Sequence, residues 1–196
     1  MIDKLLSIIR DCPLVGRTKG VSHDFDLSET KQAAQNAAKE MLKACWAPEK
    51  FPVDPYSIAE KAGAQVTFIE LPNDVAGGLL KEPDSTPIIF INQADHPNRK
   101  RFTCAHELGH FYKRFTDKHY EYYDNRNAMS SSGENVEEVF ANQFAANLLM
   151  PEEAVKAKFS ELRAAHNETI AAIVSTSHFG VSQEALNFRL NNLGLI

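Results

Sequence analysis

The spacing of hydrophobic residues along the chain predicts a mainly helical protein. Ala-rich apolar positions alternate with Lys and Glu after Ser28, a suitable N-cap residue, and predict a helix to about Trp46. A short helix is predicted after Asp54, because Asp caps helix N-termini, Pro55 suits the first helical position and Gly63 suits the end. Further helical patterns cover residues 101–114, 135–150, 151–162, 168–179 and 182–190.

Three short runs of β-branched and apolar residues predict a small sheet. They are QVTFIEL at 65–71, AGGLL at 76–80 and PIIFIN at 87–92, with Pro, Asn, Asp and Gly between them. PIIFIN suits either an edge strand that pairs with an extended substrate or an ordinary buried strand, and the sequence leaves both open. The whole pattern predicts an α+β fold, with a small three-stranded sheet packed on a helical body.

The order of the elements predicts three parts of the chain. Residues 1–27 are expected to form an N-terminal arm, because Gly, Pro and charged residues are frequent in its second half. Residues 28–158 are expected to form the core, and residues 159–196 a C-terminal element that resembles a helix-turn-helix. Within the core, a polar connector runs from about residue 116 to residue 135.

Composition narrows the classes of protein that fit. The chain has 196 residues, 43% of them hydrophobic, and a formal net charge of -5, which argues against a surface that is basic throughout and binds nucleic acid. Three cysteines, Cys12, Cys45 and Cys104, are too few for a disulfide framework and fit a reducing compartment. Because no apolar run is long enough to span a bilayer, we expect a cytoplasmic protein.

The stretch RFTCAHELGHFYKR at 101–114 carries the clearest chemical motif. On a helix, His106 and His110 lie only about 40° apart, so both imidazoles can reach one metal ion. Glu107 lies beside them and can act as the general base of a hydrolase, in the H-E-x-x-H arrangement. One Zn²⁺ ion suits these ligands. Cys104 points away from the two histidines, so we expect a buried core thiol.

A catalytic zinc needs a third protein ligand and one open position. The extended metzincin motif would place Gly at 113 and His at 116, where this chain has Lys and Thr. Glu137 and Glu138 on the helix 135–150 are the alternatives, and Glu138 is preferred because it is in line with the small residue Ala141 and with Asn142. Asn142, one turn later, is expected to orient a ligand histidine or Glu138.

Some residues are weaker candidates for a role at the metal. His119, Tyr120, Tyr122 and Tyr123 lie in the polar connector, where they are candidate donors for transition-state stabilisation or simple surface anchors. Cys12 in the N-terminal arm is a candidate latency ligand, because thiolates bind zinc well, although no spacing requires it.

Three segments together resemble the ImmA/IrrE-type metallopeptidases, a gluzincin-like family. They are RFTCAHELGHFY, the pattern E-x-x-A-N-x-F-A-A-x-L-L-M-P at 138–151, and the tail VSQEALNFRLNNLGLI. The resemblance covers the chain from about Asp54 to the C-terminus and not the N-terminal arm. Phe140 departs from the pattern, since relatives often carry an acidic residue there.

This resemblance implies a zinc-dependent endopeptidase whose protein substrate is a helix-turn-helix transcriptional repressor, so that cleavage relieves repression. By position, it implies His106, His110 and Glu138 as zinc ligands and Glu107 as general base. The alternative is a non-catalytic, metal-stabilised regulator that binds a repressor, an antitoxin or DNA.

The C-terminal helices allow a test of the DNA alternative. Gly180 is expected in a tight turn and Ser182 as the next N-cap, as in a helix-turn-helix. The second helix offers only Arg189 as a basic side chain for reading DNA. We therefore expect packing or contact with a partner protein rather than direct DNA binding.

Overall fold

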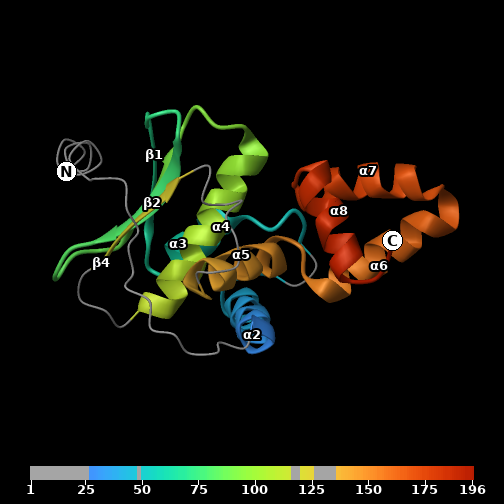
Figure 1. The fold of residues 1–196 in the computed structure, drawn as a ribbon, viewed down its shortest axis with the longest axis horizontal. Coiled ribbons are helices and arrows are strands. Elements are labelled where there is room, and N and C mark those ends of the chain that lie inside the picture. The colour runs from blue at the N-terminus through green and yellow to red at the C-terminus, as the bar shows by residue number, and fades with distance from the viewer. Residues whose placement is uncertain (1–26, 48–49, 116–119, 126–135) are drawn as a thin grey trace.

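The computed structural model describes residues 27–47, 50–115, 120–125 and 136–196 (Figure 1). Its helices are α2 (Leu27–Cys45), α3 (Pro55–Lys61), α4 (Pro97–Arg114), α5 (Val136–Leu149), α6 (Glu152–Ala165), α7 (Glu168–Phe179) and α8 (Gln183–Asn192). Its strands are β1 (Gln65–Ile69), β2 (Val75–Lys81), β3 (Ile88–Asn92) and β4 (Tyr120–Asn125). The predicted α+β class is confirmed. The predicted N-terminal arm lies almost wholly outside the described residues.

The described strands form one mixed sheet in the order β1-β3-β2-β4. β1 is parallel to β3, and β2 is antiparallel to both β3 and β4. The three predicted strands are present, and β4 joins them from the segment that was predicted as a polar connector. Of the two alternatives for PIIFIN, the buried strand is confirmed and the edge strand is wrong, because β1 and β2 occupy the two sides of β3 and leave it no free backbone edge for a peptide.

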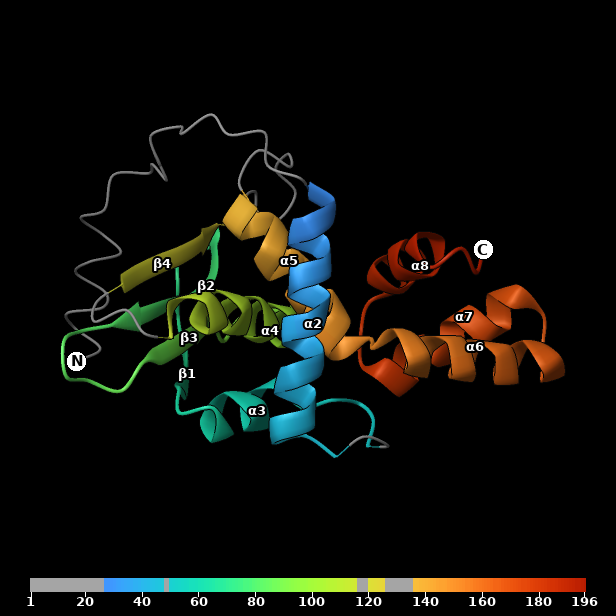
Figure 2. The same ribbon diagram turned by 90° about the horizontal axis from the view of Figure 1, so that it is seen from below.

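The helix α4 packs between the sheet and the helix α5. Figure 2 shows α4 and α5 beside the sheet, with α2 crossing them. A Cβ atom on Gly109 of α4 would lie 2.9 Å from the Cα atom of Ala141 on α5, which is closer than such atoms approach. The absence of a side chain at Gly109 is therefore what lets the two helices come this close.

The helices α6, α7 and α8 form a bundle at one end of the molecule, away from the sheet (Figure 1). Gly180 ends α7 in the left-handed conformation and the side chain of Ser182 caps α8, both as predicted. Arg101 of α4 donates to the carbonyl of Gly180 at 2.9 Å, and so links this bundle to the core. The predicted boundary after residue 158 lies within α6. No helix among the described residues is long and apolar enough to cross a membrane.

Candidate metal centre

The helix α4 positions both histidines of the HELGH motif. It begins after His96, whose ring nitrogen caps the backbone N–H of Asn98 at 3.2 Å, and Pro97 follows at the first turn. His106 and His110 are one turn apart and are both buried. Their Nε2 atoms converge to 3.0 Å, so the two rings point at one place. An ion bound there would replace this direct contact.

The carboxylate of Glu138 reaches the same place from α5. Its Oε2 atom is 3.3 Å from Nε2 of His106, and its Oε1 atom is 3.4 Å from Nε2 of His110. One donor atom from each of the three residues lies within 4.8 Å of the others, close enough to hold a metal ion. Two imidazoles and one carboxylate match the donor set of catalytic zinc sites, which leave a further position open. The chemistry of the residues thus fits a divalent metal.

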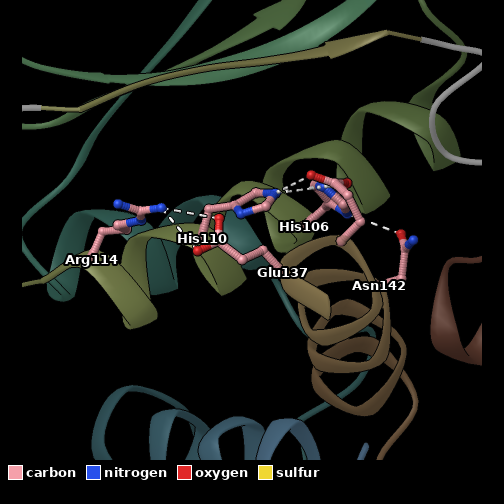
Figure 3. A network of polar contacts seen from close by, with 6 residues as sticks. His106, His110, Arg114, Glu137 and Asn142 are labelled. Atoms are coloured by element: carbon pink, nitrogen blue, oxygen red, sulfur yellow. Dashed lines mark hydrogen bonds and ion pairs between the residues drawn. The ribbon is translucent and has the colours of Figure 1, made fainter. Parts of the chain in front are cut away.

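Glu137, the other candidate for the third ligand, is paired with Arg114 and is not one of the three residues grouped to hold an ion. Its two carboxylate oxygens accept hydrogen bonds from Nη2 of Arg114 at 2.9 and 3.0 Å (Figure 3). Adjacent residues on a helix point about 100° apart, which is why one glutamate meets the histidines and the other meets the arginine. The sequence did not reveal this arginine partner, although Arg114 is one turn after His110 on the same helix.

The electrostatics of the cluster favour the protonation states that metal ligands need. Burial raises the pKa of Glu138, but the hydrogen bonds and charges of His106 and His110 outweigh burial and hold this pKa well below its usual range. Burial lowers the pKa of His110 by more than the hydrogen bond and the charge of Glu138 raise it. The carboxylate is therefore ionised and the His110 imidazole neutral near pH 7, as a metal requires.

Asn142 holds the far side of the His106 ring. Its Oδ1 atom lies 3.0 Å from Nδ1 of His106 (Figure 3). An amide oxygen can only accept, so this contact places the ring proton on Nδ1 and leaves the lone pair of Nε2 for a metal. Asn142 thus has the geometry expected of a residue that orients a metal ligand.

Glu107 and Cys104 are both fully buried on α4. Glu107 follows His106 directly, so its carboxylate belongs to the same turn of the helix as the cluster. Cys104 packs in the hydrophobic core, as predicted. Burial raises the pKa of the Cys104 thiol well above its usual value, and the negative charge of Glu107 raises it further. A protonated core thiol is not a metal ligand.

The weaker candidates fall elsewhere. Cys12 and His119 lie outside the described residues. Tyr120, Tyr122 and Tyr123 belong to β4, whose backbone pairs with β2. A role of these tyrosines in stabilising a transition state stays a prediction.

A cavity of about 690 Å³ opens beside the cluster, which the sequence did not predict. Glu138 and Asn142 of α5 line part of it, together with Lys31 of α2 and further residues from the start of α4, from α5 and from α8. Its volume falls in the range of about 300–1,000 Å³ that is typical of ligand pockets. The cavity, which is large enough for part of a polypeptide, thus borders the cluster through Glu138, whereas His106 and His110 are not among its lining residues.

Comparison with known families agrees with this geometry. The family model of the M78 peptidases, described as the IrrE N-terminal-like domain, matches residues 59–191. The chain belongs to this family. The IrrE-like match includes α4 and α5 and therefore all the residues of the metal cluster, and the family is metal-dependent. The chain thus contains a metallopeptidase-like domain.

Structural comparison supports the same fold. A solved structure of a Mycobacterium tuberculosis transcriptional regulator matches 85% of this chain with a TM-score of 0.53 and 14% sequence identity. The match covers 52% of that protein, so this chain spans about half its length. At this identity the likeness shows the fold alone. A comparison with curated protein sequences finds no match.

Proposed function

We propose that this chain is a zinc-dependent endopeptidase. The observation that carries the proposal is the convergence of His106, His110 and Glu138 on one place, with Glu107 buried in the same turn of α4. A structural metal site has no need of a neighbouring carboxylate that does not bind the ion, whereas a hydrolase needs a base. The M78 family model supports a peptidase rather than another hydrolase.

The residues divide the chemistry between them. His106, His110 and Glu138 would hold the ion, and Asn142 would keep the His106 ring in the binding tautomer. A zinc ion bound there would polarise the scissile carbonyl and make the attacking water more acidic. The Glu107 carboxylate accepts the proton of that water and delivers it to the nitrogen of the leaving amine.

The proposed substrate is a helix-turn-helix transcriptional repressor. We place this chain in the cytoplasm, together with that substrate. The support for this substrate is the sequence resemblance to ImmA/IrrE-type peptidases. The C-terminal helices suit protein contact better than DNA contact. Arg189, their one candidate for base reading, is buried and donates to Asn147 and to the carbonyl of Met150.

The deciding experiment compares the wild type with Glu107→Gln, both loaded with zinc. Each is incubated with the repressor encoded beside the gene, and fragments are identified by mass spectrometry. We expect cleavage by the wild type alone, with equal zinc content in both proteins. Equal zinc content without fragments from either protein would instead support the non-catalytic regulator.

A further inference from the structure

The cavity beside the metal cluster follows one face of α5. Glu138, Asn142 and Ala146 all line it and are spaced by four residues, so they form a single stripe along the helix. Eight residues of helix cover roughly 12 Å, which equals about three to four residues of an extended peptide. The cavity therefore continues from the metal ligands over a length that several substrate residues can occupy.

More of the surface that lines this groove is apolar than polar, although charged residues such as Lys31, Arg99 and Glu184 also line it. Its apolar lining residues include Phe102 of α4, Val139 and Ala146 of α5, and Ala185 and Phe188 of α8. Small side chains at 146 and 185 leave the space open. An apolar groove that begins at a metal ligand is suited to apolar side chains of a polypeptide whose backbone lies at the metal.

Phe188 is the exposed aromatic residue of this groove. It is 65% exposed, whereas Leu186 and Leu190 on the same helix are fully buried. Its neighbour Arg189 is buried too and fixes α8 to α5 through Asn147 at 2.8 Å and the carbonyl of Met150 at 3.1 Å. The anchored helix thus places a large apolar side chain outside the core and at the groove.

We propose that this groove selects the substrate by binding an apolar side chain within about three residues of the scissile bond, with Phe188 as the specificity-determining residue. This inference rests on the proposed peptidase function. It assigns α8 a role as a wall of the substrate groove, not as a DNA-reading helix. The occupant is a substrate segment because Glu138 belongs to both the groove and the metal cluster, and Asn142, which contacts His106, lines the groove beside it, so a peptide in the groove would lie next to a metal ligand.

The test uses short peptides that carry a hydroxamate, a metal-chelating group, at either end. Each peptide is an alanine tripeptide, either unchanged or with Phe or Glu in place of one alanine. Its affinity for the zinc-loaded protein is measured by calorimetry. In the wild type, at least one Phe peptide should bind about tenfold more tightly than the alanine peptide, the effect of covering one aromatic side chain. Phe188→Ala should reduce this preference to less than threefold.

Two further variants separate the groove from general effects of mutation. Phe115→Ala removes an aromatic residue that is 62% exposed but does not line the groove, so the preference should persist. Ala146→Phe fills the groove, so the Phe peptides should lose their advantage while the alanine peptide still binds. No preference in the wild type, or an unchanged preference in Phe188→Ala, would overturn the inference.

The design also separates this inference from the peptidase function. A wild type that cleaves protein but shows no preference for Phe peptides contradicts the groove and leaves the peptidase intact. A selective groove without cleavage of any protein contradicts the peptidase function instead. A wild type that binds neither zinc nor hydroxamate overturns both.

Discussion

Oδ1 of Asn142 lies 3.0 Å from Nδ1 of His106, on the side of the ring opposite to His110 and Glu138. The acceptor on one ring nitrogen decides which nitrogen keeps a lone pair for a metal. The helix α5 therefore supplies both the carboxylate of Glu138, which belongs to the cluster, and the amide of Asn142, which fixes the tautomer of His106. The two residues are one turn apart, so a shift of α5 would displace both together.

Replacing Asn142 should weaken metal binding without removing a ligand. Asn142→Leu keeps the approximate size of the side chain but loses the acceptor, so zinc affinity should fall by about 10–100-fold. Asn142→Asp keeps an acceptor and should stay near the wild type. Competition with a chromophoric chelator measures both affinities. Wild-type affinity in Asn142→Leu would show that the contact only packs α5 against α4.

The two neighbouring glutamates should differ sharply when each is removed. Glu138→Ala should lose stoichiometric zinc, because only two protein ligands remain in place. Glu137→Ala should keep zinc, because that carboxylate is paired with Arg114. Metal analysis after gel filtration gives the stoichiometry of each variant. Full zinc occupancy in Glu138→Ala would exclude it as the third ligand.

The close approach of α4 and α5 at Gly109 should be intolerant of added atoms. A Cβ atom at this position would lie 2.9 Å from the Cα atom of Ala141 and 3.2 Å from the Cβ atom of Phe144. Overpacking of this kind costs about 1–3 kcal/mol, against a gain of about 1 kcal/mol from helix propensity. Gly109→Ala should therefore be less stable in urea and bind zinc more weakly. The same crowding should lower the free energy of unfolding further in Gly109→Ser. Equal free energies of unfolding for the wild type, Gly109→Ala and Gly109→Ser would refute this prediction.

Tyr56 should make stability depend on pH in alkaline solution. Burial raises the pKa of Tyr56 to about 12, although the positive charge of Arg101 opposes the shift. The unfolded chain, with a tyrosine pKa of about 10, releases this proton first, so the stabilisation is present below pH 10 and is lost as the pH rises toward 12. Urea denaturation at pH 8.5, 10 and 11 should show that the free energy of unfolding falls more steeply with pH in the wild type than in Tyr56→Phe. Parallel losses would contradict a raised pKa.

Much of the metal cluster was predictable because a helix has a fixed period. The spacing of His106 and His110 placed both rings on one face, and the same geometry set Glu138 apart from Glu137 and Cys104 apart from the histidines. Local signals also predicted the ends of α3 and the turn at Gly180. These features depend on residues that are close in sequence, or on two helices packed through small side chains.

Features that depend on distant parts of the chain were not predictable in this way. The interior position of β3 results from the addition of β1 and β2 on its two sides, which the alternation of side chains within one strand does not encode. The sequence offered Arg189 as the one basic side chain of the last helix for reading DNA, but it is buried by partners, Asn147 and Met150, that are some forty residues away in sequence. The groove has the same origin, because residues from α2, α4, α5 and α8 line it.

Metal binding should also stabilise the folded chain, since the three ligands meet only in the native state. A metal that binds the native state alone at 100 times its dissociation constant adds about 2.7 kcal/mol to the free energy of unfolding. Thermal denaturation of the wild type should therefore shift to higher temperature with added zinc and return with a chelator. Glu137→Ala should behave likewise, while Glu138→Ala should show little shift. An equal shift in Glu138→Ala would place the stabilising ion away from the cluster of His106, His110 and Glu138.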